Sequence, residues 1–94
     1  MKIEQYLLCV LEEELLEAAH RVSKAQRFGL MECQPKQTMD NRTRLVSELN
    51  DVIAMLEMTG IDKHPSLGNR YEIESKKKRV EEFINYSKQC GQLS

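Results

Sequence analysis

The sequence predicts an all-α fold, and three observations support this prediction. The chain of 94 residues contains only two prolines and four glycines, too few turn-forming residues for a sheet of many strands. Hydrophobic residues make up 40% of the chain and charged residues 31%, a balance that suits amphipathic helices. Apolar residues recur at helical spacing in three segments, and the two prolines lie in the connectors between them. We therefore expect three helices in a single domain over residues 1–94.

The first helix is expected to run from Ile3 to about Arg27. This stretch contains no proline or glycine, and Gly29 follows at the position where a helix commonly ends. Its apolar residues recur at three- and four-residue spacing, which predicts one apolar stripe. The stripe comprises Leu7, Leu11, Leu15, Ala18, Val22 and Ala25.

A second helix is expected between Asp40 or Asn41, either of which can cap its first turn, and Gly60. The preceding stretch from Leu30 to Met39 has no apolar period and contains a proline, so it is predicted to be a loop. The apolar positions of the second helix are Leu45, Leu49, Val52, Met55 and Leu56.

The third helix is expected from about Tyr71 to Cys90. Residues 62–69 hold Pro65 and Gly68 and form the second connector, and Gly91 follows the helix. The residues predicted to point inward are Ile73, Val80, Phe83, Ile84 and Tyr86.

Composition restricts the class of protein. The net charge of −1 provides no basic field for nucleic acid. Three cysteines without CxxC spacing argue against a disulfide framework or a zinc knuckle and favour a reducing cytosol. No segment approaches the roughly 18 apolar residues of a membrane span, and no export signal is evident. We expect a cytoplasmic protein with no membrane or nucleic-acid partner, and so small a chain favours self-association.

Two acidic clusters are the candidate site. Glu13, Glu14 and Glu17 lie in the first predicted helix, and Glu48 and Asp51 lie in the second. Carboxylates three positions apart point to the same side of a helix. Two such helices packed together would gather carboxylate oxygens around one point, and this donor set favours Mg²⁺ or Mn²⁺ over zinc.

Glu48 is the most informative of these acids. It lies angularly between Leu45, Val52 and Met55, which are expected to face the core. Burying an unpaired carboxylate is costly, and the nearest expected side chains are other acids. A bound cation would neutralise them. Glutamate runs are also common on solvated helix faces, so the first cluster alone has little weight, and the prediction depends on both clusters together.

The two clusters and their flanking residues resemble a known family. Glu13-Glu14-x-x-Glu17 followed by Glu48-x-x-Asp51 is similar to the signature of the MazG-like all-α nucleoside triphosphate pyrophosphohydrolases. The flanking segments 24–29 and 41–45, together with Glu48-Leu49-Asn50-Asp51-Val52, resemble the small single-domain, phage-type branch of this family.

The resemblance implies a four-helix-bundle-type core completed by oligomerisation, as a homodimer or homotetramer. It also implies Mg²⁺-dependent hydrolysis of a nucleoside triphosphate, usually deoxy or non-standard, to the monophosphate and pyrophosphate, in the host cytoplasm if the protein is phage-encoded. An alarmone is a further candidate substrate. The implied metal ligands are Glu14, Glu17, Glu48 and Asp51, and Glu13 or Glu14 would orient or deprotonate the attacking water.

Cationic side chains are expected to complete a phosphate site. The candidates are Lys24 and Arg27 after the first cluster and Lys76 in the third helix. Each of them could equally be a solvated surface residue.

Two alternatives stay open. Phosphoribosyl-ATP pyrophosphohydrolases share the acid pattern and a similar length. The other alternative is a non-catalytic helical interaction module. Its acidic face would dock a basic partner, and residues 76–79 would contact an acidic one. Such binding would weaken with salt and would not depend on Mg²⁺. The inward position of Glu48 argues against this module, because a docking charge should lie on the rim.

Overall fold

The computed structural model describes all 94 residues and contains three α-helices, one short 3₁₀ helix and no strand. The all-α prediction is therefore confirmed. The chain divides into two units, residues 1–63 and residues 64–94, and each is described by itself. None of the helices combines the length and apolar character needed to cross a membrane.

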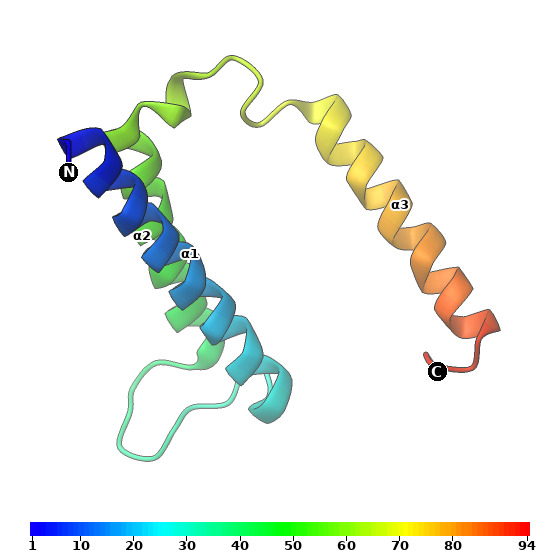
Figure 1. Cartoon of the computed structure of the whole chain (residues 1–94). Helices are drawn as coiled ribbons and strands as arrows, with labels where there is room; N and C mark the ends of the chain where they lie inside the picture. The colour runs from blue at the N-terminus through cyan, green and yellow to red at the C-terminus, as the bar shows by residue number, and fades with distance from the viewer. The chain divides into compact units, whose positions relative to one another are not determined.

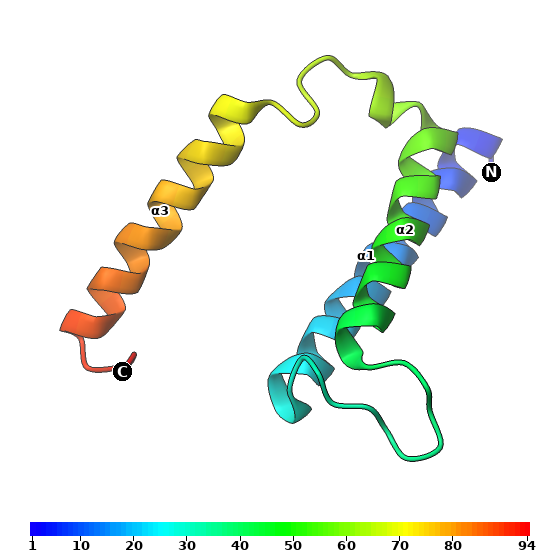
Figure 2. The ribbon, with the colours of Figure 1, turned by 180° about the vertical axis from the view of Figure 1, so that it is seen from behind.

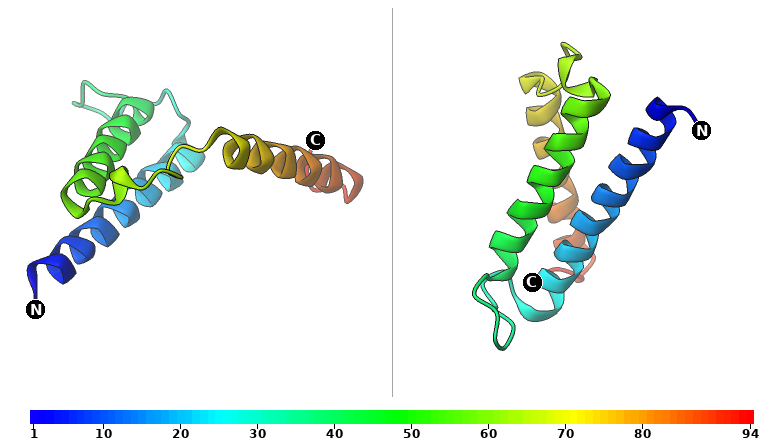
Figure 3. Two further views of the ribbon diagram at one scale, coloured as in Figure 1. Left: turned by 90° about the horizontal axis from the view of Figure 1, so that it is seen from above. Right: turned by 90° about the vertical axis from the view of Figure 1, so that its left-hand side faces the viewer.

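The first unit is a hairpin of two long helices. Helix α1 spans Ile3–Phe28 and helix α2 spans Asn41–Thr59; they pack side by side in every view (Figures 1, 2 and 3). The Asp40 side chain caps α2 by accepting a hydrogen bond of 2.8 Å from the Thr43 amide. Gly60 ends α2 with a φ of 78°, a left-handed conformation that glycine adopts without steric cost. A 3₁₀ turn, η1, follows at Ile61–Lys63.

The core of the hairpin is small. Four apolar residues are buried between the helices, and four more pack partly against them. The buried residues are Leu11, Ala18, Val52 and Met55, and the partly buried ones are Leu7, Val10, Leu45 and Leu56.

Four residues of the predicted apolar stripes lie outside this core, and one of them, Ala25, is half-buried. Leu15, Val22 and Leu49 are exposed. The predicted stripes are therefore wider than the contact between two helices. A single partner helix covers only the central strip, so apolar residues at the stripe edges stay in solvent.

The loop at residues 29–40 is tied back to α2 by Asn41, the most deeply buried polar residue. Its side-chain amide donates hydrogen bonds to the Gly29 carbonyl at 2.8 Å and to Glu32 Oε2 at 2.9 Å. Its backbone amide donates to the Glu32 carbonyl at 3.0 Å. The sequence left the cap of α2 open between Asp40 and Asn41. The structure assigns the cap to Asp40 and gives Asn41 the separate task of holding the loop.

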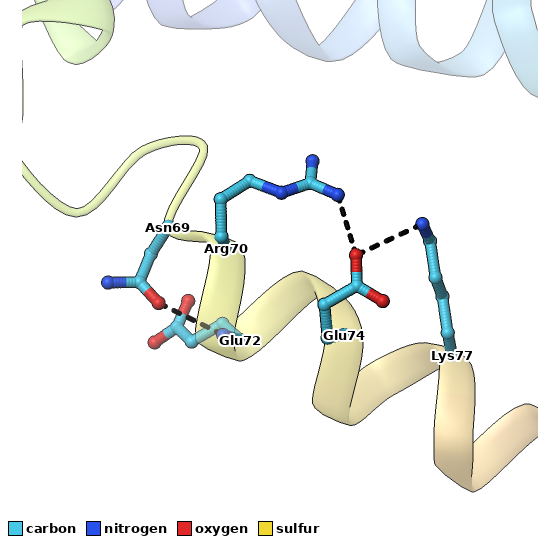
Figure 4. A network of polar contacts seen from close by, with 5 residues as sticks. All are labelled: Asn69, Arg70, Glu72, Glu74 and Lys77. Carbon is cyan, nitrogen blue, oxygen red and sulfur yellow. Dashed lines mark hydrogen bonds and ion pairs between the residues drawn. The ribbon is translucent and has the colours of Figure 1, made fainter.

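The second unit consists of helix α3, Arg70–Gln89, and its flanking segments. The Asn69 side chain caps it by accepting a hydrogen bond of 2.9 Å from the Glu72 amide. Glu74 then pairs with Arg70 at 2.6 Å and with Lys77 at 3.3 Å, as Figure 4 shows. These local contacts explain why the helix begins at this position.

The residues predicted to point inward from the third helix are not buried. Ile73 is half-buried, and no residue of α3 is fully buried. Val80, Phe83, Ile84 and Tyr86 are exposed. A helix alone in its unit can satisfy its backbone hydrogen bonds, but it has no second surface within that unit on which to bury an apolar stripe. The prediction of a core made from three helices is thus confirmed only for α1 and α2.

Two methionines of α2 test the extent of this core. Met55 is 7% exposed and Met58 is 63% exposed. Met55→Ala should lower the free energy of unfolding by about 2–3 kcal/mol, since it leaves a cavity in the hairpin. Met58→Ala should change it by less than about 0.5 kcal/mol. Urea unfolding followed by circular dichroism measures both, and equal losses for the two variants would contradict the core described here.

Candidate metal centre

Three of the five predicted acids meet between the two helices of the hairpin. Glu14 of α1 and Glu48 and Asp51 of α2 each offer a carboxylate oxygen, and these three oxygens lie within 4.8 Å of one another. Glu14 and Glu48 are half-buried, and Asp51 is exposed. We call these three residues the acidic triad. Glu13 and Glu17 are exposed and lie outside it.

The helix contact determines why the triad forms. Glu14 lies three residues after Leu11 and four before Ala18, so it borders the buried strip of α1. Glu48 lies four residues before Val52, on the matching strip of α2. Packing the two strips against each other therefore brings carboxylates from opposite helices to the same edge of the core.

The triad is electrostatically unfavourable without a partner. Partial burial raises the pKa of Glu14 above its usual value, and the negative charges of Asp51, Glu48, Glu17 and Glu13 raise it further. The other four predicted acids thus all act on this one carboxyl group, although only two of them belong to the triad with Glu14. A proton or a cation bound there would relieve this repulsion.

Arg21 of α1 is the residue that the sequence prediction missed. Its Nε lies 4.0 Å from Glu48 Oε1, and the two side chains are 19% and 20% exposed. The acids expected nearest to Glu48 are present, but the expectation did not include this basic neighbour. Arg21 lies seven residues after Glu14, two helical turns along the same face. That spacing could have identified it, but the pairing itself crosses between helices.

The ion pair between Arg21 and Glu48 is incomplete. A separation of 4.0 Å is too long for a hydrogen bond. Nε and Nη1 of Arg21 are both buried and have no hydrogen-bond partner. The guanidinium therefore reduces the negative charge around Glu48 without satisfying its own donors.

Two of the predicted phosphate-binding cations belong to α1, and the third belongs to the second unit. Lys24 is half-buried on α1 and forms no ion pair. Arg27, in the last turn of α1, lies over the ring of Phe28 at 5.3 Å from its centroid. Lys76 is exposed on α3, in the second unit. Neither Lys24 nor Arg27 is joined to the triad by a hydrogen bond or an ion pair.

The donor chemistry of the triad fits a hard divalent cation. Carboxylate oxygens are the ligands that Mg²⁺ and Mn²⁺ prefer, and Glu14, Glu48 and Asp51 supply them from two rigid helices. Exposed acidic groups are also common without a metal, so their proximity alone does not establish a metal site. Comparison of the chain with protein-family models, curated proteins and solved structures finds no match.

The raised pKa of Glu14 predicts how the stability of the metal-free protein depends on pH. The folded state holds this proton to a higher pH than the unfolded chain, whose carboxyl titrates near the ordinary value of 4.5. The contribution of Glu14 to stability should therefore decrease as the pH rises through the raised pKa. In the presence of a chelator, Glu14→Gln should raise the melting temperature at pH 7 and leave it nearly unchanged at pH 4.

The control for this experiment is Glu12→Gln, which removes an exposed charge of the same helix outside the triad. It should shift the melting temperature by less at pH 7. If both variants gave the same shift at both pH values, the stabilisation would reflect net charge rather than the triad.

Proposed function

We propose that this protein is a Mg²⁺-dependent nucleoside triphosphate pyrophosphohydrolase that releases pyrophosphate from a deoxy- or non-standard nucleotide or an alarmone. The observation that carries the proposal is the meeting of Glu14 with Glu48 and Asp51. These residues come from the two sequence clusters that resemble the family signature. A nucleotide of the intracellular pool as substrate would place the activity in the cytoplasm.

The roles of the acids follow from the chemistry of the reaction. When bound, Mg²⁺ would neutralise charge on the triphosphate oxygens. Glu48 and Asp51 would hold the metal from α2, and Glu14 and Glu17 would do so from α1. Substitution at the α-phosphorus also requires an oriented water, and Glu13 or Glu14 would orient or deprotonate it. The raised pKa of Glu14 supports a role in proton transfer, because a carboxyl group titrating closer to neutral pH is a better general base.

Lys24, Arg27 and Lys76 are the proposed contacts to the substrate phosphates. Lys24 and Arg27 follow the triad along α1 toward the loop, so a phosphate chain extending from the triad in that direction would reach them. Lys76 of α3 is the third candidate for a phosphate contact. Ammonium and guanidinium groups stabilise the charge of phosphate oxygens during transfer.

Self-association is part of the proposal, because the hairpin leaves an apolar face uncovered. Leu8, Leu15 and Val22 are exposed and recur every seven residues along α1. Val46, Leu49 and Ile53 are exposed at spacings of three and four residues along α2. Both stripes flank the buried strip on the side opposite the triad, as helical periodicity places them. A homodimer or homotetramer would bury this face and complete a four-helix bundle.

Pyrophosphate release tests the activity directly. With Mg²⁺, the protein should release pyrophosphate from at least one member of a panel of standard, deoxy and modified nucleoside triphosphates and alarmone nucleotides. Glu48→Gln should lower turnover by at least about a hundredfold, because the metal and the reacting phosphate lose their position. Glu57→Gln removes an exposed carboxylate from the same helix and should leave turnover unchanged.

Absence of pyrophosphate release from the whole panel would rule out the enzyme. Turnover of phosphoribosyl-ATP alone would instead favour the histidine-pathway alternative. Salt-sensitive binding of a charged protein partner that is indifferent to Mg²⁺, without turnover, would favour the interaction module.

Two neighbouring leucines of α1 test the proposed assembly. Leu15 is 51% exposed and belongs to the uncovered apolar face, whereas Leu16 is 63% exposed and lies one residue, about 100°, further round the helix. Leu15→Glu should shift the protein toward a monomer of 11.0 kDa in sedimentation equilibrium, because the interface would have to bury a charge. Leu16→Glu should keep the oligomer. A monomeric wild-type protein would exclude assembly through this face.

A further inference from the structure

Arg21 is the least satisfied charged residue of the hairpin. Its side chain is largely buried, yet Nε and Nη1 have no hydrogen-bond partner. An arginine normally enters an interface only where its planar set of donors meets acceptors. Glu17, one turn earlier on the same helix, could accept such a bond, but it forms no ion pair with Arg21. These two buried donors therefore have no acceptor within the chain.

Arg44 of α2 shares this property on the facing helix. Its Nε is buried without a partner, while its Nη2 donates to Gln37 Oε1 of the loop. Arg21 follows Glu14 by seven residues on α1, and Arg44 precedes Asp51 by seven residues on α2. The two helices run antiparallel (Figure 1). By residue number, both arginines are therefore nearer to the loop along their helices than the acidic triad is. Each helix thus carries an arginine with an unsatisfied buried donor on the loop side of the triad.

We propose that Arg21 exchanges partners when substrate binds: it pairs with Glu48 in the ligand-free protein and donates its free N–H groups to a polyphosphate oxygen when Glu48 holds a cation. The polyphosphate class of this ligand rests on the proposed function. The positive charge that balances Glu48 is then always present, first as the guanidinium and afterwards as the cation.

The geometry of the pair favours exchange over a permanent ion pair. The 4.0 Å separation between Nε and Glu48 Oε1 leaves no hydrogen bond to break when the two part. Arg21 already has buried donors free, and a guanidinium can bind phosphate oxygens through two of them at once. Arg27, by comparison, lies over Phe28 and is exposed.

The proposal predicts opposite effects on two ligands. Without a polyphosphate, Arg21 repels a cation and competes with it for Glu48, so removing the guanidinium should strengthen the binding of a cation alone. With a polyphosphate, the same change removes donors to phosphate, so binding should weaken. A residue that only supports the packing of the helices would weaken both.

The experiment measures binding of two probes to the full chain, independently of hydrolysis. Mn²⁺ alone is titrated by electron paramagnetic resonance, and inorganic tripolyphosphate is titrated by calorimetry in saturating Mg²⁺. Arg21→Met should bind Mn²⁺ at least about threefold more tightly and tripolyphosphate at least about tenfold more weakly. Arg21→Lys keeps the charge and loses the paired donors, so Mn²⁺ binding should stay near wild type while tripolyphosphate binding weakens.

Arg42→Met is the matched control, because it removes an exposed guanidinium from the first turn of α2. It should move neither affinity by more than about twofold, the effect of a screened surface charge. Circular dichroism checks that each variant is folded, and Arg21→Lys carries the tripolyphosphate test if Arg21→Met does not fold.

Weakened or unchanged binding of both probes by Arg21→Met would overturn the exchange, as would weaker tripolyphosphate binding without tighter Mn²⁺ binding. Failure of the wild-type protein to bind either probe would also overturn it. If the opposite shifts occurred and no nucleotide were hydrolysed, the exchange would stand and the proposed enzymatic function would fail. If nucleotides were hydrolysed without these shifts, the reverse would follow.

Discussion

The contact between α1 and α2 is the interaction on which the rest of this unit depends. Four buried apolar residues, Leu11, Ala18, Val52 and Met55, hold the two helices together. Because this apolar strip is narrow, polar side chains at its edges also lie in the interface between α1 and α2. The separation and rotation that suit the apolar residues therefore also decide how closely Glu14 and Glu48 approach. The candidate site and the core both result from the packing of these two helices. A substitution that alters the packing of one should therefore also alter the geometry of the other.

The site combines groups that do not satisfy one another. Partial burial and neighbouring carboxylates raise the pKa of Glu14, while Arg21 lies close to Glu48 without a hydrogen bond. Natural sequences usually avoid such local conflicts, and those that persist are concentrated at sites that bind or react. A divalent cation and an anionic phosphate chain would satisfy both the carboxylates and the arginine. The proposed substrate contains both charges in one complex, which connects the metal proposal with the role proposed for Arg21.

The apolar surfaces that the hairpin leaves exposed are the second constraint on this fold. Leu15 and Leu49 belong to apolar stripes that a two-helix contact cannot bury, and α3 buries none of its residues. The loop, in contrast, is fixed by the hydrogen bonds of Asn41 to Gly29 and Glu32. The loop is thus held in place by hydrogen bonds and not by burial of apolar residues. The proposed bundle would extend burial to the remaining apolar face by adding helices from a second copy.

The sequence by itself determined the helices, because helix formation depends on contacts within a few residues. The expected limits of the three helices agree with the structure to within about a residue. Gly60 ends α2 as predicted, and its cap is Asp40, one of the two predicted candidates. It also identified Glu14, Glu48 and Asp51, since helical spacing places them beside the apolar stripes. Only the tertiary structure decided that these three meet without Glu13 and Glu17, that Arg21 rather than another acid faces Glu48, and that Leu15 stays exposed. These outcomes depend on the rotation and axial shift of one helix against another, which residues near in sequence do not encode.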